Sequence, residues 1–207
     1  PITNVQNGIL NLASDGSYTY TPLDDYFGTD SFLYELLDGA GGASQATVNI
    51  TVNGVNDPPE LELPTDKYTD EDTAISIGGI IFNDIDIADS EMKMDINVLN
   101  SFVSLGQIDG LTFISGDGME DSQLSFTGNK TNILNATSTI TFIPEENYNG
   151  VVAVEVSISD IGGNGSGGTL FDTDEFLVTI SSVNDLPVVN SPGGQSDDED
   201  NEFSIYG

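Results

Sequence analysis

The sequence contains no cysteine, histidine, tryptophan or arginine. Without histidine, cysteine and arginine, most familiar catalytic triads and transition-metal sites cannot be built, which predicts a protein that is not an enzyme. The missing cysteines say little about redox compartment, because a bound metal can replace disulfides in stabilising a small domain. Metal sites made of oxygen ligands are still compatible with this composition, and Ca²⁺ is the cation that they favour.

Positive charge is nearly absent as well. Three lysines face 35 acidic residues, which gives a formal net charge of −32. Such a surface repels phosphate backbones and anionic headgroups, which excludes nucleic acid as a partner and direct contact with a membrane surface. It also repels itself, so we expect the compact state to need cations.

Long hydrophobic runs are also lacking, so no segment is expected to insert into a membrane. Short runs with apolar residues at every second position are present instead, and this period is typical of strands. Many short strands separated by turns predict an all-β protein built from Greek-key sandwiches, with no convincing helix. The alternating runs centre on residues 10–12, 18–20, 32–36, 48–52, 92–98, 124–126, 140–142, 152–158 and 176–180.

The sequence repeats itself in four segments that align in order. "PLDDYFG" at 22–28 matches "PEENYNG" at 144–150, and "LLDGAGG" at 36–42 matches "SISDIGG" at 157–163. The offset then grows because the second copy carries the longer loop "GGNGSGGTLFDTD", which we predict to be flexible. "VNDPP" matches "VNDLP" near 55–59 and 183–187, and "TDEDT" at 69–73 matches "SDDEDN" at 196–201. Such a tandem pattern predicts an array of similar domains.

Acidic residues collect at the expected strand ends. Glu71, Asp84, Asp86, Glu145 and Asp160 all fall in loops or at strand termini of the second copy. Carboxylates crowded at the poles of a sandwich repel each other unless a cation lies between them, and Ca²⁺ binds six to eight oxygens. An isolated Asn-Asp-x-Pro segment predicts only a turn that ends a strand. The combination with these acids favours calcium sites.

The motifs quoted above resemble the cadherin-like tandem repeats of large bacterial surface proteins and adhesins. Residues 10–59 are similar to the closing half of such a repeat, and residues 110–187 are similar to a longer variant. The resemblance implies a cadherin-like or immunoglobulin-like sandwich with calcium between successive domains. It also implies an extracellular location at the cell surface.

The resemblance further implies which residues bind calcium. For the first junction these are Asn56 and Asp57 of the linker, Asp24 or Asp25 of the preceding domain, and Asp84, Asp86 and Asp160 of the following domain. For the second junction they are Glu71, Glu145, Asn184 and Asp185. Asp38 belongs by the same argument to the junction upstream, and Glu199 to the junction downstream.

The predicted organisation is the closing part of one repeat (1–57), a complete repeat (58–187), and the linker and first strands of a third (188–207). The predicted function is a calcium-rigidified stalk or filament that extends a binding module from the cell, with neighbouring repeats of the chain as its first partners. Two alternatives stay open. The repeats themselves bind cell-surface glycans, or they bind other copies of the protein, with residues 188–207 of one copy completing residues 1–57 of another as donated strands do.

Overall fold

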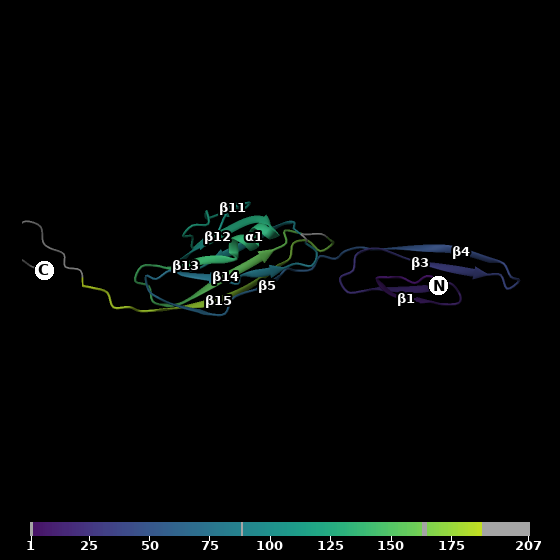
Figure 1. Ribbon diagram of the computed structural model, residues 1–207, viewed down its shortest axis with the longest axis horizontal. Coiled ribbons are helices and arrows are strands. Elements are labelled where there is room, and N and C mark those ends of the chain that lie inside the picture. Colours follow the sequence, from purple (N-terminus) through teal and green to yellow (C-terminus); the bar gives the residue numbers. More distant parts are fainter. Residues whose placement is uncertain (1, 88, 163–164, 188–207) are drawn as a thin grey trace, which may run out of the picture.

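Two β units lie end to end along the long axis of the protein, joined by the linker Gly54–Asp57 (Figure 1). The computed structural model describes residues 2–87, 89–162 and 165–187. We call residues 2–53 the N-terminal unit and residues 58–187 the central unit. Among the described residues, no sheet combines strands from both units. The linker is the covalent connection between the two units.

The N-terminal unit consists of two hairpins. The first places β1 against β2 and the second places β3 against β4, both antiparallel. Its one fully buried apolar side chain among the described residues is Phe32, which contacts the ring of Tyr18 edge-on at 5.3 Å between centroids. The strands are β1 (Gly8–Leu12), β2 (Tyr18–Pro22), β3 (Gly28–Leu37) and β4 (Ala43–Val52).

Asp30 is the buried polar centre of the N-terminal unit. Its carboxylate accepts hydrogen bonds from the backbone N–H groups of Gln6, Asn7 and Ser31 and from the hydroxyl of Tyr20. Burial alone would raise the pKa of Asp30, but these donors together lower it below the ordinary value. Burial and the same contact with Asp30 raise the pKa of Tyr20 to about 12. The bonds tie the segment before β1 to β3.

The central unit is a sandwich of a six-stranded sheet and a three-stranded sheet. The six-stranded sheet has the order β11-β12-β9-β14-β15-β6, the three-stranded sheet has the order β10-β13-β7, and β5 pairs with β8. The strands are β5 (Glu60–Glu62), β6 (Lys67–Asp70), β7 (Ile75–Gly78), β8 (Ile81–Asn83), β9 (Glu91–Asn97), β10 (Ser101–Leu105), β11 (Thr112–Ser115), β12 (Gln123–Asn129), β13 (Thr139–Pro144), β14 (Gly150–Ser159) and β15 (Phe171–Ser181).

The alternation seen in the sequence forms the core between these sheets. Every second residue of β9, β12, β13 and β14 is buried, and these side chains form one cluster that includes Met94, Phe126, Phe142 and Val154. The intervening residues face outward, as expected for strands covered on one face. The all-β sandwich class predicted from the sequence is confirmed.

The two units share strand registers. Gly28 pairs with Val52 and Gly150 pairs with Ile180, so β3 and β4 correspond to β14 and β15 with the same sequence offsets. Gly8 pairs with Pro22 and Ser101 pairs with Pro144, so β1 and β2 correspond to β10 and β13. The matching motifs "PLDDYFG" and "PEENYNG" form the same turn, in which Asp25 and Asn147 both have φ 58°.

One expectation from the sequence is wrong, because the central unit contains a helix. Helix α1 (Lys130–Thr137) begins after Asn129, whose side chain accepts a hydrogen bond from the N–H of Asn132. It lies in the longer connection between β10 and β13 and buries Ile133 and Ala136 against the core. Its threonines and asparagines have low helix propensity, so tertiary packing stabilises this short helix where sequence pattern does not.

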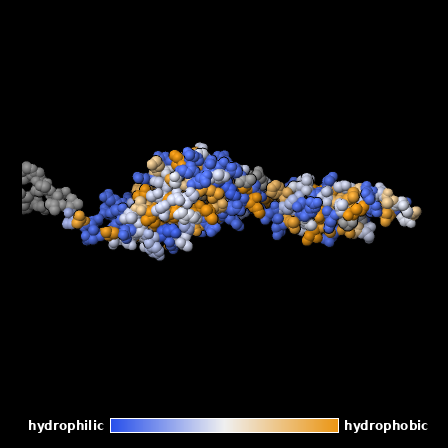
Figure 2. Space-filling model, in the orientation of Figure 1, coloured by the Kyte–Doolittle hydropathy of each residue, from blue (hydrophilic) through white to orange (hydrophobic). Residues whose placement is uncertain are grey.

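The surface shown in Figure 2 is mixed, with apolar residues scattered among hydrophilic ones on both units. None of the helices in the described ranges has the length and apolar character to cross a membrane.

We expect the N-terminal unit to depend on ionised Asp30. Because hydrogen bonds lower its pKa in the folded state, Asp30 contributes stability above the unfolded pKa of about 3.9, and this contribution is lost as pH falls through the folded value. In chelator near neutral pH, Asp30→Asn should lower the melting temperature of the N-terminal unit. NMR signals from β1–β4, recorded as the temperature is raised, measure this melting temperature. The difference from the parent should shrink as the solution is acidified.

Asp24→Asn, at an exposed position of the same unit, is the control and should melt like the parent. A deficit for Asp30→Asn that is equally large at every pH would contradict the assigned role of the charge.

Candidate functional site at the junction

Asn56 of the linker is buried against the central unit. Its side-chain Nδ2 donates to the carboxylate of Asp160, which follows β14, and to the backbone oxygen of Gly168 at 2.9 Å. Its backbone N–H donates to the oxygen of Ser166 at 3.0 Å. Only 5% of Asn56 is exposed, although it lies in a connection between two units. The linker is therefore bound to the central unit through this side chain.

Asp57 binds the same end of the central unit through its backbone. Its N–H donates to Asp86 Oδ2 at 2.6 Å. Asp84 Oδ1 in turn accepts from the N–H groups of Asp86 and Ile87, at 2.9 and 3.2 Å, which shapes the loop after β8. The structure thus gathers Asn56, Asp57, Asp84, Asp86 and Asp160 at one pole.

Two oxygens in this cluster have no hydrogen-bond donor. Asn56 Oδ1 and Asp84 Oδ2 are the buried side-chain polar atoms without a partner in the described part of the chain. Asp84 is 4% exposed, and its neighbours Asp86 and Asp160 are also buried, with exposed fractions of 9% and 2%. A buried oxygen without a partner costs free energy, so an ion or another donor would stabilise this site.

The pKa of Asp84 is raised above the ordinary value. Burial is the largest cause, and the nearby negative charges of Asp86 and Asp160 add to it, while the N–H donors of Asp86 and Ile87 oppose it. A carboxylate in this environment favours either a proton or a cation. The electrostatics therefore fit a bound cation.

The donor set also fits a hard cation, with one restriction. Within residues 2–87, 89–162 and 165–187, no three carboxylates are placed to hold one metal ion. In this conformation an ion would therefore use the amide oxygen of Asn56 and backbone carbonyls in addition to carboxylates. Ca²⁺ accepts such mixed oxygen ligands, whereas Zn²⁺ prefers nitrogen and sulfur.

Asp25 reaches the junction from the N-terminal unit. Together with Asp57 it lines two clefts beside the linker, of about 230 and 340 Å³, and Asp86 lines the larger one. Asp24 is exposed and lines neither cleft. Of the two alternatives that the sequence left open, Asp25 is the one beside the linker.

The opposite pole of the central unit holds the second predicted group. Buried Glu71 accepts from the N–H of Val183 at 2.6 Å and from the side chain of Asn149 at 3.4 Å. The turn that contains Glu145 is thus near Glu71, although Glu145 itself is exposed. Asn184 and Asp185 are exposed and follow directly after Val183.

The two remaining predicted ligands lie apart from both groups. Asp38 is exposed in the turn between β3 and β4, where Oδ1 accepts from the N–H groups of Ala40 and Gly42, each at 2.8 Å. These two hydrogen bonds lower the pKa of Asp38. Glu199 lies outside the described residues.

The sequence did not identify Ser166 and Gly168 as junction residues. They belong to the glycine-rich loop that we expected to be flexible, and in the structure both residues contact the linker. Ser166 forms a parallel β-bridge with Val55, and its N–H donates to the oxygen of Gly54 at 3.0 Å. These are backbone contacts, which residue types do not predict. The greater length of the loop in the second copy was the available signal.

Residues 2–54 match the family model described as a bacterial cadherin-like domain. For residues 2–54 this match confirms the resemblance to bacterial cadherin-like repeats stated from the sequence.

Other known proteins are similar over a larger part of the chain. The protein GAMETE EXPRESSED 2 of Arabidopsis thaliana is 28% identical over 203 residues, which is 90% of this chain, and the chain spans 21% of that relative's length. Repeats EC1-2 of human protocadherin-24 align with 87% of this chain and 82% of their own, at 14% identity and a TM-score of 0.44. Repeats EC1-2 of human mucin-like protocadherin align with 88% and 80%, at 13% identity and a TM-score of 0.42.

Without a cation, the charge of Asp84 should destabilise the central unit. Asp84→Asn keeps the oxygen that accepts from Asp86 and Ile87 and replaces the unpaired oxygen with an N–H₂ group beside two carboxylates. In chelator near neutral pH the variant should melt about 2–4 °C above the parent, the shift that about 1 kcal/mol produces in a domain of this size. Because the folded pKa is raised, the gain should vanish as acidification protonates Asp84.

Differential scanning calorimetry measures the melting temperatures of Asp84→Asn and of the parent. Asp174→Asn is the matched control because Asp174 is exposed in the middle of β15. If Asp84→Asn melted below the parent in chelator, the charge of Asp84 would not be destabilising and the prediction would be contradicted.

Proposed function

We propose that the chain is a non-catalytic segment of an extracellular surface protein, in which calcium stiffens the junction between cadherin-like repeats. The observation that carries this proposal is the pair of buried oxygens without donors, Asn56 Oδ1 and Asp84 Oδ2. They come from the linker and from the central unit, so a cation between them would bind both.

The residues that would hold the ion are those already gathered at the pole. Asn56 and Asp84 supply the unpaired oxygens, and Asp86 and Asp160 supply carboxylates whose other oxygens orient the linker and the loops. Asp57 and Asp25 face the adjoining clefts. Ca²⁺ would supply positive charge where repulsion among carboxylates is strongest.

Rigidity follows from the position of this group of residues. The two units share no sheet among the described residues, so their relative orientation depends on a few linker contacts. An ion bound to linker and central unit together removes freedom at that point and favours the extended arrangement of Figure 1. An extended segment of this kind suits a stalk that holds a distal binding module away from the cell, with neighbouring repeats of the same chain as its partners.

The site is poorly suited to catalysis. A carboxyl with a raised pKa is a common general acid, but Asp84 is 4% exposed and its neighbours are equally buried. A substrate would have to reach it through the linker. The same burial suits a resident ion.

Calcium should stabilise the central unit and the junction. Ligand that binds only the folded state at about a hundred times its dissociation constant adds about 2.7 kcal/mol. For a protein of this size we expect millimolar Ca²⁺ to raise the melting temperature by about 5–10 °C relative to chelator. Asp84→Asn and Asn56→Ala should lose most of this shift, and Asp174→Asn should retain it. An equal melting temperature in calcium and in chelator would exclude the proposal.

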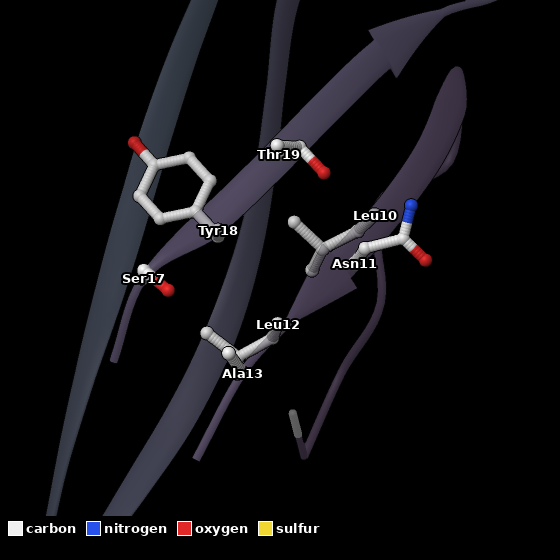
Figure 3. A pocket seen from close by; sticks show the side chains of 7 residues that line it. All are labelled: Leu10, Asn11, Leu12, Ala13, Ser17, Tyr18 and Thr19. Atoms are coloured by element: carbon white, nitrogen blue, oxygen red, sulfur yellow. The ribbon is translucent and has the colours of Figure 1, made fainter. Parts of the chain in front are cut away.

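Self-association is a second candidate, favoured by strand edges in the N-terminal unit. Strand β13 pairs with β10 and β7, whereas its counterpart β2 pairs only with β1 among the described residues. Likewise β15 pairs with β14 and β6, whereas β4 pairs only with β3. The hairpin of β1 and β2 also borders an open cleft of about 570 Å³, lined by Leu10, Leu12 and Tyr18 (Figure 3). In the third copy of the repeat, the segment that aligns with β7 is "FSIY" at residues 203–206. It lies outside the described residues.

If another copy supplies strands to these edges, the sedimentation coefficient should rise with protein concentration. Ile9→Glu and Leu36→Glu place charge on exposed apolar positions of the N-terminal unit and should abolish the rise. Leu99→Glu changes an equally exposed leucine of the central unit and should leave it unchanged. A parent that sediments as a monomer at all concentrations would exclude this second function.

A further inference from the structure

The glycine-rich loop after β14 contacts the linker in a way that calcium chemistry does not require. The N–H of Ser166 donates to the backbone oxygen of Gly54 at 3.0 Å. The N–H of Asn56 donates to the backbone oxygen of Ser166, also at 3.0 Å. The oxygen of Gly168 accepts from the Asn56 side chain at 2.9 Å. We call Gly165–Gly168 the linker clamp.

The glycines allow the clamp to lie against the linker backbone. Gly165 has φ +147°, and a Cβ there would lie 2.8 Å from the nitrogen of Asn56 and 3.0 Å from the carbonyl carbon of Val55. Gly167 has φ +151°, and a Cβ there would lie 3.3 Å from the Cβ of Asn56. Side chains at these positions would push the loop off the linker.

Comparison of the two units shows that the clamp is an addition to a shared turn. In the N-terminal unit the N–H of Asp38 donates to the oxygen of Gly42 at 3.1 Å. In the central unit the N–H of Asp160 donates to the oxygen of Leu170 at 3.2 Å, and Asp160 Oδ1 accepts from Leu170 as Asp38 Oδ1 does from Gly42. The base of the turn is the same, and the clamp lies within the extra length of the second loop.

Asp160 connects the clamp to the candidate ion site. Oδ1 accepts from the N–H groups of Gly162 and Leu170 at the base of the loop, while Oδ2 accepts from Asn56. The clamp therefore presents Asn56 to the buried carboxylates through protein contacts alone.

We infer that the linker clamp orders the linker on the central unit before any cation binds, and so limits the orientations of the two units even without calcium. Backbone bonds from Gly54 and Asn56 to Ser166, together with the bond from Asp57 to Asp86, hold three linker residues on the central unit. Calcium then binds to an ordered linker and stiffens the junction further.

Spin-label distance measurements test this inference directly. The chain has no cysteine, so Thr47→Cys on β4 and Val151→Cys on β14 place one label on each unit at exposed positions. In chelator the parent should give one narrow distance distribution. Gly165→Ala should lose the narrow distribution, because its Cβ meets the linker backbone.

Two control variants separate the clamp from backbone strain and from the serine hydroxyl. Gly41, in the turn between β3 and β4 and outside the clamp, has φ +101° with nothing within 4 Å of a Cβ, so Gly41→Ala carries backbone strain without a clash and should stay narrow. Ser166→Ala keeps the backbone bonds and should also stay narrow. If Gly165→Ala destabilises the central unit in melting experiments, Ser166→Pro removes the N–H that donates to Gly54 and serves as the second test.

A parent distribution in chelator as broad as that of Gly165→Ala would overturn the inference, as would identical distributions for Gly165→Ala and Gly41→Ala. A further measurement rests on the proposed function: Gly165→Ala should bind calcium more weakly in calorimetry, by about tenfold if the ordered linker falls to about a tenth of the population. Absence of calcium binding to the parent would remove the proposed function but leave the result in chelator intact.

Discussion

The burial of one polar side chain, Asn56, is the constraint on which the junction depends. An amide in a connection between two units would ordinarily face water, and placing it under a loop is stable only when its polar atoms find partners. Asp160 and Gly168 satisfy its nitrogen, and its oxygen points to no donor in the described part of the chain. That imbalance gives the site its chemistry, because an acceptor left over beside several carboxylates favours a positive charge.

The rest of the central unit provides the rigid framework for this arrangement. Asp84 and Asp160 follow strands on different sheets, and the sandwich core holds those strand ends together. The same topology carries Glu71 to the opposite pole, where it binds the chain leaving β15. Each end of the sandwich therefore offers a buried acid to a segment that enters or leaves it.

Differences between the two units show how such a framework varies. The shared strands keep their registers, while the connection between β10 and β13 gains β11, β12 and α1, and the turn after β14 gains the clamp. Insertions at turns leave the core unchanged because loops lie on the surface. In this protein one such insertion changes the junction, since it reaches the preceding linker rather than solvent.

The amino-acid pattern was sufficient for the strands, the sandwich class and the repeat, because alternation and turn residues are local and recur at fixed offsets. The resemblance to cadherin-like repeats placed Asn56, Asp84, Asp86 and Asp160 in one predicted group. Helix α1 and the linker clamp were decided by tertiary structure alone. Helix α1 forms from residues of low helix propensity because Ile133 and Ala136 complete the core, and the clamp forms through backbone groups that every residue possesses. The glycines at 165 and 167 permit the clamp, but their type does not say which segment they contact, and only the folded chain brings these partners together.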